Sequence, residues 1–555
     1  MDYYDLGPYN RPVTAASAEA QLWFDRGLNW IYGYNHGEAL SCFKKALKSD
    51  PDCAMAQWGI AYAVGPNYNM QWHHYDEASK AKALAGAHRA TQAALALVDR
   101  VSPMEKALIS ALPARYPQAE PIEDQTPWNA AYAEAMRAVY RALPDDLEVN
   151  ALFAEALLNV TPWQMWDLKS GGVAKGAHTA EARTVLERAM AELPGAMQHP
   201  GILHLYVHLM EMSPFPELAL RAGDALRELV PDAGHLIHMP THIDILCGHY
   251  RDTLLWNQKA VTADRKFLER DGAMNFYTAY RIHNYHFAIY GAMFLGQYEP
   301  ALAAAEELIE TVPEALLRQE SPPMADFIES YLAMKQHVYI RFGKWREIIA
   351  QELPADDTVY CNTVASIHYA KGVAHAALGE IEEAEREKAL FLAAKARVPE
   401  SRLLHNNTCV ALLEIAAEML DGEIEYRKGN HDAAFAHLRR SVELDDNLPY
   451  DEPWGWIQPT RHALGALLFE QGRVEEAEAV YREDLGLGGS LSRASIHPDN
   501  VWSLRGLYEC LLLEGETAEA RLIKQRLDLA AARADTPVGA SCFCAQAAMQ
   551  AVAAE

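Results

Sequence analysis

The stretch GRVEEA at residues 472–477 represents the motif from which the fold of this chain is predicted. Similar stretches occur elsewhere, namely YNHGEA at 34–39, GQYEPA at 296–301, GEIEEA at 379–384, GNHDAA at 429–434 and GETAEA at 515–520. On both sides of each stretch, apolar residues recur three and four positions apart, which indicates amphipathic helices. The glycine marks a turn, and the small alanine lets the two helices approach closely. Each stretch therefore predicts a helix–turn–helix pair.

The spacing of these turns predicts a stack of such pairs. From Gly248 onward, where Gly248 and Gly343 begin degenerate copies, the turn glycines lie about 36 to 50 residues apart, near the 34 residues of a tetratricopeptide (TPR) repeat. Prolines that stop the second helix follow several pairs, at Pro51, Pro144, Pro194, Pro231 and Pro313. A single pair cannot bury its own apolar face, so neighbouring pairs must stack. We predict an all-α solenoid of TPR-like helix pairs, forming a superhelix with a concave groove.

The length of the chain and changes in its composition suggest four segments. With 555 residues, the chain exceeds the usual size of one hydrophobic core and forms several domains or one elongated array. We predict N-terminal TPR-like pairs with aromatic loops over residues 1–194, histidine-rich pairs over 195–313, further repeats over 314–535, and a cysteine-containing tail over 536–555. The histidine-rich segment is the one that carries recognisable chemistry.

The charge of the chain and its first residues exclude several classes of partner. The 49 Lys and Arg residues against 76 Asp and Glu residues give a formal net charge of -27, which repels nucleic acid. We find no run of roughly 18 apolar residues, the length needed to cross a bilayer. The first residues, MDYYDLGP, lack the basic start and the apolar run of a secretory signal. We expect a cytoplasmic protein that binds neither nucleic acid nor membrane.

The 8 cysteines are scattered along the chain, so free thiols are the expected state. Cys542 and Cys544 alone are close enough in sequence to suggest more. They can ligate a soft metal, pair with another thiol, or be incidental residues of the tail.

The stretch HPGILHLYVHLME at residues 199–211 carries the strongest chemical signal. On a helix, His204, His208 and Glu211 are four and three residues apart, so their side chains lie on one face. Imidazole is costly to bury without a partner, and this spacing is typical of metal ligands. A single HxxxH pair arises easily by chance, so the interpretation needs support from elsewhere in the chain.

Two later stretches supply that support. HLIHMPTH at residues 235–242 repeats the four-residue step, and RIHNYH at 281–286 places two histidines three residues apart. Both fall on first helices of consecutive pairs, which line the inner face of a TPR stack and lie side by side. We predict that the metal ligands come from His204, His208, His238, His242, His283 and His286. The alternative is a set of buried histidines that are hydrogen-bonded to asparagine, tyrosine and carbonyl groups.

Several of these stretches together resemble one family of proteins. AQLWFDRGL at residues 20–28, GPNYN at 65–69, the helix with His204 and Glu211, GHLIHMPTHI at 234–243, HNYHF at 283–287 and YDEPW at 450–454 are similar to a family of long bacterial and fungal TPR proteins. The likeness extends over nearly the whole chain. It implies an α-solenoid fold and carries no catalytic assignment, since that family is largely uncharacterised. Its members often begin with an export signal, which MDYYDLGP does not resemble.

Two loops rich in aromatic residues follow helices in the first segment. NYNMQWHH at residues 67–74 comes after Gly65-Pro66, and TPWQMWD at 161–167 comes after Val160. Both loops can cover a pocket. The candidate substrate-binding residues are Trp72, Trp163, Trp166, Tyr68 and Tyr280. The alternative is ordinary packing, because Trp and Tyr often close the ends of helices.

The donor set indicates a transition metal. Imidazoles from several helices, without a nearby thiolate pair and with few carboxylates, suit copper, iron or zinc rather than magnesium or calcium. Copper or iron is favoured. Six imidazoles can divide between two copper ions that bind dioxygen, whereas His204, His208 and Glu211 with an open position resemble a mononuclear zinc or iron centre. We predict a metal-dependent oxidoreductase that acts on a small molecule in the concave groove, with Glu211 as a ligand or general base.

Two other functions stay open at this point. A zinc-dependent hydrolase would use the same residues, with Glu211 as the general base that activates zinc-bound water. A peptide- or protein-binding scaffold without catalysis is the commonest use of TPR grooves. Such grooves usually offer Lys, Arg and Asn to carboxylate termini, whereas the central segment here offers aromatic residues and histidines.

Overall fold

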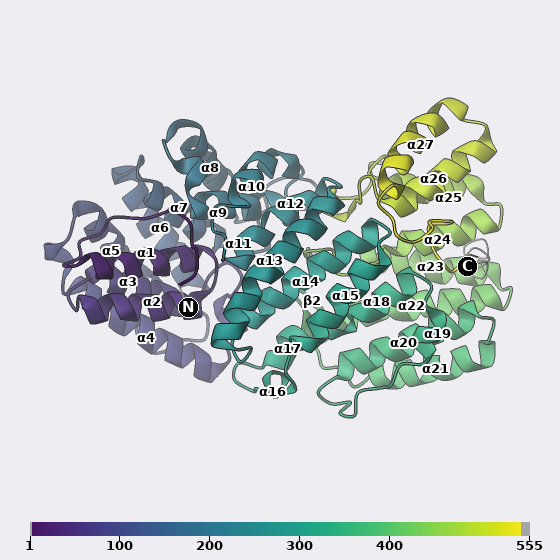
Figure 1. The fold of residues 1–555 in the computed structure, drawn as a ribbon, viewed down its shortest axis with the longest axis horizontal. Helices are drawn as coiled ribbons and strands as arrows, with labels where there is room; N and C mark the ends of the chain where they lie inside the picture. The colour runs from purple at the N-terminus through teal and green to yellow at the C-terminus, as the bar shows by residue number, and fades with distance from the viewer. Residues whose placement is uncertain (1–2, 546–555) are drawn as a thin grey trace. The chain divides into compact units, whose positions relative to one another are not determined.

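The computed structural model describes residues 3–545, and nearly all regular structure within them is α-helical (Figure 1). Two short strands, β1 (Leu403–Leu404) and β2 (Asn407–Thr408), form an antiparallel hairpin in which Leu403 pairs with Thr408 and Leu404 with Asn407. The predicted all-α class is confirmed.

The chain divides into two compact units. The first extends to Ile243 and takes in Lys259–Gly272, whereas the second comprises Asp244–Gln258 and the residues from Ala273 onward. Helix α13 (Tyr250–Asp271) therefore contributes to both units. These divisions fall inside the predicted central segment 195–313, and the four-segment division stays a prediction.

The first unit is built of helices that pack on their neighbours in sequence. Helix α1 (Ala18–Tyr32) packs on α2 (His36–Ser49), α2 on α3 (Ala54–Val64), and α3 on α4 (Glu77–Leu95). The same pattern continues through α5 (Pro103–Arg115), α6 (Thr126–Ala142), α7 (Leu147–Leu158), α8 (Thr179–Glu192) and α9 (Pro200–Glu211). The short helices α10 (Leu220–Leu226), α11 (Gly234–His238) and the start of α12 (Pro240–Leu246) complete the unit. Such neighbour-on-neighbour packing is the arrangement of a helical-pair stack.

The second unit repeats this arrangement. Its helices are α14 (Tyr277–Phe294), α15 (Tyr298–Glu310), α16 (Glu314–Leu317), α17 (Met324–Ile328), α18 (Met334–Arg341), α19 (Trp345–Ile349), α20 (Cys361–Ala377), α21 (Ile381–Lys395), α22 (Cys409–Arg427), α23 (His431–Asp446), α24 (Thr460–Glu470), α25 (Val474–Asp484), α26 (Val501–Glu514) and α27 (Thr517–Ala531). α20 packs on α21, α22 on α23, α24 on α25 and α26 on α27. The first helices of successive pairs are also in contact: α20 packs on α22, and α24 packs on α26. TPR-like helix pairs are therefore present as predicted.

The turn glycines of the second unit have the backbone conformation that the repeat motif implies. Gly296, Gly379, Gly429, Gly472 and Gly515 have φ values of 70, 80, 83, 72 and 79°. This left-handed region is disfavoured for residues with a Cβ. A glycine in this conformation ends the helix and lets the chain reverse direction sharply. The motif that predicts the fold therefore acts through the absence of a side chain at one position.

Helix α9 lies against α1 because Gly201 has no side chain. A Cβ on Gly201 would come within 2.2 Å of the Tyr32 ring. The start of α9 is fixed by Pro200 in its first turn and by the His199 ring, whose Nδ1 accepts from the Ile202 N–H at 3.2 Å. His199 is thus a helix cap. The sequence around residue 200 determines both where α9 begins and how closely it approaches α1.

A buried polar network joins four helices of the second unit, α18, α24, α25 and α26. The Asp484 carboxylate accepts from His462 Nε2 at 3.0 Å, from His497 Nδ1 at 2.8 Å and from Ser503 Oγ at 2.6 Å. Arg341 donates to His462 Nδ1 at 2.9 Å, so the imidazole of His462 has a partner at each nitrogen. Because both nitrogens of His462 have hydrogen-bond partners within the protein, its burial is explained by a structural role and needs no bound ligand.

The described part of the tail is anchored to this network. Arg341 donates to the Ser541 carbonyl at 3.0 Å, and Ser541 Oγ donates to the His462 carbonyl at 2.9 Å. Cys542 and Cys544, the pair that the sequence singles out, form a disulfide with each other, whereas the other six cysteines, all among the described residues, are not disulfide-bonded. The rest of the predicted tail, residues 546–555, lies outside the described residues.

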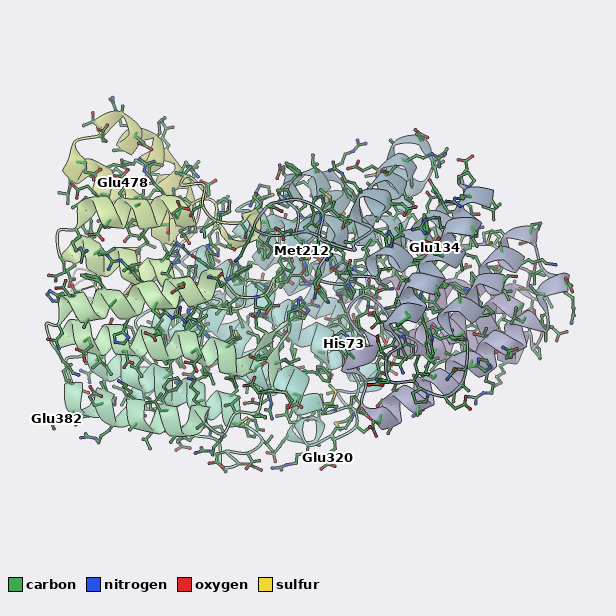
Figure 2. The ribbon with its side chains drawn as sticks, turned by 180° about the vertical axis from the view of Figure 1, so that it is seen from behind. His73, Glu134, Met212, Glu320, Glu382 and Glu478 are labelled. Carbon is green, nitrogen blue, oxygen red and sulfur yellow. A yellow bond between two sulfur atoms is a disulfide. The ribbon has the colours of Figure 1, made fainter. Side chains whose placement is uncertain are left out.

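The described surface carries many acidic side chains, such as Glu134 and Glu382, which are exposed and labelled in Figure 2. Within residues 3–545, none of the helices has the length and apolar character needed to cross a bilayer. Buried apolar side chains, by contrast, occur along every long helix of both units.

Replacing Phe543 by alanine tests whether the tail is part of the folded core. Phe543 is 3% exposed and its ring lies 6.1 Å from that of Trp502. Truncation of such a buried ring costs about 3–5 kcal/mol, because it removes apolar burial and leaves a cavity. We expect chemical denaturation to show that loss for Phe543→Ala. Leu513→Ala, at a side chain that is 67% exposed, should change stability by less than about 0.5 kcal/mol. Equal stability of the two variants would contradict the prediction.

Candidate metal centre

Helix α9 presents His204, His208 and Glu211 on one face, as their spacing predicts. The rings of His204 and His208 have centroids 4.7 Å apart, and His208 Nδ1 lies 2.9 Å from Glu211 Oε1. Each of the three side chains is at most 1% exposed. The face of α9 that carries them is therefore removed from water, where each polar atom needs a partner.

Three more imidazoles come from α11 and α12. His235 and His238 belong to α11, which ends before Met239, and His242 belongs to α12, which Pro240 begins. Proline has no N–H to continue a helix, so it separates the two short helices. The rings of His238 and His242 nevertheless lie 4.7 Å apart, which keeps the step of one turn that the sequence predicts.

The five imidazoles form a closed ring of neighbours. Consecutive centroid separations are 4.7 Å from His204 to His208, 6.1 Å from His208 to His242, 4.7 Å from His242 to His238, 5.8 Å from His238 to His235 and 4.9 Å from His235 to His204. All five side chains are at most 2% exposed. We call these residues the histidine ring. It lies wholly within the first unit.

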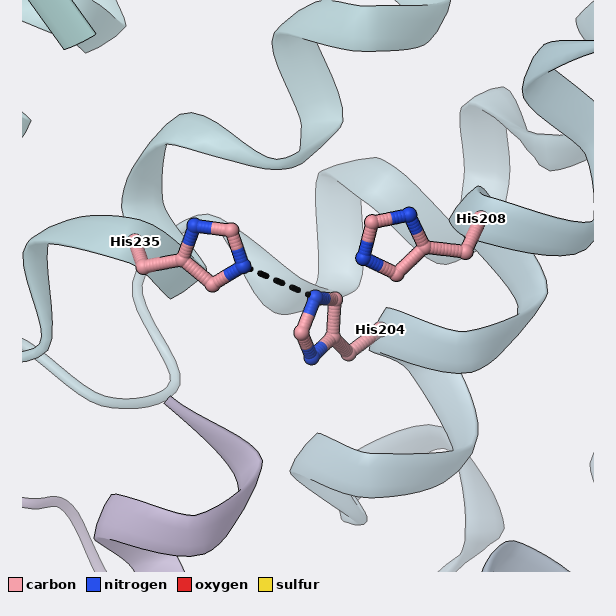
Figure 3. Close-up of side chains that lie close together, drawn as sticks. All are labelled: His204, His208 and His235. Carbon is pink, nitrogen blue, oxygen red and sulfur yellow. Dashed lines mark hydrogen bonds between the residues drawn. The ribbon is translucent and has the colours of Figure 1, made fainter. Parts of the chain in front are cut away.

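Three members of the histidine ring are arranged as ligands of one ion would be. His204, His208 and His235 each offer a ring nitrogen within 4.8 Å of the other two, and Figure 3 shows their rings directed toward one another from two helices. Two nitrogens bound tetrahedrally at about 2.0–2.1 Å are about 3.3–3.4 Å apart. The Nε2 atoms of His204 and His235 are separated by 3.2 Å, close to that value.

The pair formed by His238 and His242 differs. Their Nε2 atoms are 2.7 Å apart, a hydrogen-bonding distance that is too short for two ligands of one tetrahedral ion. The geometry therefore separates a group of three imidazoles that can share an ion from a hydrogen-bonded pair beside it.

The tautomers of two ligand candidates follow from their Nδ1 partners. His204 Nδ1 lies 2.8 Å from the Tyr32 carbonyl oxygen, which can only accept, so in the neutral ring Nδ1 carries the hydrogen and Nε2 carries a lone pair. His208 Nδ1 donates to the Glu211 carboxylate, which leaves its Nε2 as a lone pair too. Among the described residues, His208 Nε2 is buried and has no hydrogen-bond partner. A buried acceptor without a partner is expected where a side chain binds a metal ion.

Glu211 orients two members of the histidine ring at once. Its Oε1 accepts from His208 Nδ1 at 2.9 Å, and its Oε2 accepts from His242 Nδ1 at 2.8 Å. A carboxylate on Nδ1 fixes the tautomer of a ligating histidine and increases the basicity of its other nitrogen. Both carboxylate oxygens of Glu211 thus face imidazole N–H groups. Its predicted role as ligand or general base stays a prediction.

Burial keeps these imidazoles neutral. Burial, with a smaller contribution from the charge of His242, lowers the pKa of His204 to about 3. Burial and the neighbouring imidazoles also lower the pKa of His208 and of His235 well below the usual value. Because only the neutral ring has a lone pair to give, ligands of this kind are ready to bind a metal at neutral pH.

Aromatic side chains cover the group of three. The Tyr34 ring lies 4.6 Å from that of His204 and 5.2 Å from that of His235, and the Tyr68 ring lies 4.6 Å from that of His208. Trp163 lies 4.5 Å from Tyr68. Tyr34 and Trp163 have φ values of 53 and 60°, in the left-handed region that residues with a Cβ rarely adopt. Backbone strain of this kind concentrates at functional sites.

Both aromatic loops contribute residues to one pocket, and the substrate-binding role of their aromatic side chains stays a prediction. The pocket has a volume of about 260 Å³ and is lined by Gln71, Trp72, His73, Lys80, Glu123, Asp124, Gln125, Thr126, Asn129, Asn159, Val160, Thr161, Pro162 and Gln164. Among the described residues, Trp72 Nε1 and Thr161 Oγ1 are buried and lack a hydrogen-bond partner. Pro162, which lines the pocket, directly precedes Trp163, whose ring lies 5.9 Å from that of His208.

Buried ion pairing anchors the first loop, whereas Trp166 anchors the second. Arg115 pairs with Glu155 at 3.2 Å and donates to the Pro66 carbonyl at 2.6 Å, while the ring of Tyr62 lies 4.4 Å from its guanidinium. Trp166 Nε1 donates to the Leu209 carbonyl near the end of α9 at 2.7 Å. Trp166, a candidate for substrate binding, therefore also has a structural role.

Three candidate residues, His283, His286 and Tyr280, belong to α14 of the second unit. The His283 ring lies 5.7 Å from that of His405, and the His286 ring lies 5.2 Å from that of Tyr331. Neither ring nitrogen of His286 has a hydrogen-bond partner among the described residues. Their predicted roles as ligands and substrate-binding residue stay predictions.

Two residues of the candidate centre are missing from the predicted set. His235 precedes His238 by three residues, and that spacing was a usable signal. Tyr34 belongs to a turn motif, and its contact with three imidazoles depends on a left-handed backbone conformation that the sequence pattern does not predict.

The site and fold thus define an all-α, TPR-like protein with a buried histidine ring. No family model matches the chain, and no curated protein does. A solved structure described as "Structure of Naa15/Naa10 bound to HypK-THB" is similar at 13% sequence identity, over 92% of this chain and 76% of that chain, with a TM-score of 0.22. Likeness at that score carries no argument about function, and membership of the resembled TPR family stays a prediction.

Acid should destabilise the fold through its buried imidazoles. The pKa is lowered, first by burial, to about 3 for His204 and His286 and to about 4 for His36, His337 and His462. Unfolded histidine binds a proton below about pH 6.5 while these rings stay neutral, so stability is lost as pH falls from 6.5 toward 4. At pH 5, each such group lowers the free energy of unfolding by about 2 kcal/mol relative to neutral pH. Thermal unfolding at pH 7.5 and 5.0 measures the loss.

The matched variant for this experiment is His286→Leu, which removes one titrating ring that makes no hydrogen bond to the described residues. We expect the stability difference between pH 7.5 and 5.0 to shrink by about 2 kcal/mol. An unchanged difference would show that the His286 ring titrates normally in the folded chain.

Glu211→Gln tests the orienting role of the carboxylate. A glutamine oxygen can accept from one imidazole, but its NH₂ group must then face the Nδ1 atom of the other ring and donate to it. That ring changes tautomer and loses the lone pair on Nε2. Loss of such a partner typically lowers metal affinity by about 10–100-fold. Competition with a chelator measures the affinity, and a value within twofold of the parent would refute this role for Glu211.

Proposed function

We propose that the chain is a metal-dependent enzyme whose metal is held by His204, His208 and His235. The observation that carries this proposal is the buried Nε2 lone pair of His208, which has no partner among the described residues and faces two further imidazoles. A desolvated acceptor costs about 1–3 kcal/mol when it is left unsatisfied. An ion that binds three such nitrogens removes that cost.

The surrounding groups fit this assignment. The Tyr32 carbonyl and the Glu211 carboxylate hold the Nδ1 hydrogens of His204 and His208, as partners of metal-ligating histidines usually do. An ion in place of the hydrogen bond to His204 would be bound by the other neutral tautomer of His235, in which the ring hydrogen has moved from Nε2 to Nδ1. Three protein ligands leave a further position for water or substrate, which is the arrangement of catalytic rather than structural sites.

The ligand type restricts the metal. Neutral imidazoles suit copper, iron and zinc, whereas magnesium and calcium prefer oxygen donors. The group of three contains no carboxylate. Copper or iron is our favoured occupant, with zinc as the alternative.

Oxidation of a small molecule is the reaction class that the surroundings favour. Copper or iron supplies electron transfer and dioxygen chemistry when it is bound to such ligands. Tyr34 and Tyr68 pack directly on the three imidazoles, and Trp163 packs on Tyr68, so oxidisable aromatic rings form a path from the site to the loop that lines the pocket. The 260 Å³ pocket is large enough for a small polar substrate.

The other two functions receive less support. A hydrolase would need Glu211 as a base, but both of its oxygens accept from imidazole N–H groups. A scaffold without catalysis gives no reason to bury five imidazoles in one ring. Metal-dependent oxidation is therefore the first function to test.

Metal analysis of the purified chain is the direct experiment. We expect close to one equivalent of copper or iron per chain after growth with both metals and zinc, together with an absorption band that zinc cannot give. His204→Ala/His208→Ala should lose the ion, since two of three ligands are gone, while circular dichroism and thermal unfolding show a folded chain.

His437→Ala is the matched control, because His437 is half-buried, pairs with Glu418 and lies outside the histidine ring. It should keep the metal. The proposal fails if the parent chain stays metal-free after exposure to copper, iron and zinc in turn. Bound zinc with no dioxygen consumption would instead support the hydrolase.

A further inference from the structure

A wide groove lies between α2, α3 and α4 of the first unit. It has a volume of about 770 Å³ and is lined by Leu40, Lys44, Gln57, Ile60, Val64, Ser79, Lys82, Ala83, Gly86, Arg89, Ala90 and Ala93. None of these residues belongs to the histidine ring or to the loops around it. The groove is therefore a separate feature of the molecule.

The groove has an apolar floor and a cationic rim. Leu40, Ile60 and Val64 are only half-buried and form its floor, while Lys44, Lys82 and Arg89 are exposed along it. No acidic side chain lines the groove. Within residues 3–545, none of the three cations has an acidic side chain within ion-pair distance. This combination offers apolar contact and positive charge to the same ligand.

The three cations of the groove are opposite in sign to the chain as a whole. The formal net charge is -27, and several exposed Lys and Arg residues elsewhere pair with a carboxylate, as Arg100 does with Asp52 and Lys428 with Glu385. A local patch of the opposite sign attracts an acidic ligand that the rest of the surface repels. The charge of the groove therefore selects its occupant.

Gly86 keeps the groove open at a cost to α4. It lies in the interior of that helix, where glycine costs about 1 kcal/mol relative to alanine. Packing gives no reason for it, since the nearest atom to a Cβ at this position would be Val64 Cγ2 at 3.8 Å, an ordinary contact. The missing side chain instead adds space to the groove.

We propose that this groove binds an amphipathic helix of a partner protein, with apolar residues on one side and acidic residues beside them. The lining residues of α4 extend from Ser79 to Ala93, which is about 21 Å at 1.5 Å per residue and matches a helix of about 14 residues. An amphipathic helix typically binds in a groove lined by aliphatic side chains. The helix inserts apolar anchor residues into the groove at intervals of one turn. Acidic side chains of the ligand then meet Lys44, Lys82 and Arg89.

Fluorescence anisotropy with a synthetic peptide tests this proposal on the full chain. The probe is a labelled 16-residue helix with leucines three and four positions apart and glutamates on both flanks, designed to bury an apolar stripe and present charge beside it. We expect saturable binding that weakens with salt, because ion pairs contribute. Lys44→Glu/Lys82→Glu/Arg89→Glu should weaken it at least tenfold.

Gly86→Leu is the sharper variant, since it fills the groove without changing charge. Leucine has the higher helix propensity, so α4 should stay folded while binding is lost. The charge control is Arg100→Glu/Lys106→Glu/Lys175→Glu, which makes the same change in net charge at exposed residues outside the groove and should leave binding within twofold.

Three outcomes would overturn the proposal. The first is binding that survives both groove variants. The second is equal binding of a scrambled peptide of the same composition, which would show that charge alone acts. The third is absence of peptide binding together with capture by vesicles rich in phosphatidylserine, which would indicate a lipid surface. None of these results depends on whether the histidine ring binds a metal.

Discussion

The burial of neutral imidazole is the constraint on which the candidate centre depends. A polar ring that is removed from water needs partners for its nitrogens, and here the Nδ1 partners lie outside the histidine ring. Backbone and carboxylate oxygens hold Nδ1 of His204, His208 and His242, so the Nε2 atoms face inward. The direction in which each lone pair points is thus decided outside the histidine ring, by Tyr32 and Glu211.

That arrangement links the site to the packing of the first unit. The Tyr32 carbonyl belongs to the last residue of α1, and it reaches His204 because Gly201 lets α9 approach the Tyr32 ring. Glu211 reaches His242 across to α12, whose start is set by Pro240. A glycine and a proline, neither of which has a functional group, therefore decide which nitrogens meet. In this protein the chemistry of the site cannot be separated from the stacking of its helices.

Much of this architecture is readable in the sequence, and the remainder depends on contacts that no local pattern encodes. Turn glycines predict the helical pairs because a left-handed residue at a helix end leaves a clear signature. The HxxxHxxE spacing likewise places three side chains on one face of α9. Tyr34 is different, since its proximity to the imidazoles depends on a strained turn. The burial of the tail against Arg341 and His462 is equally a matter of distant contacts.

The near-complete enclosure of the histidine ring has a kinetic consequence. With every imidazole of the histidine ring at most 2% exposed, exchange of an ion between the ring and solvent would need a transient local opening of the surrounding helices. Its residence time then follows the frequency of local opening rather than the strength of the nitrogen contacts alone. An ion added to the folded chain is therefore expected to enter slowly, at a rate set by these openings.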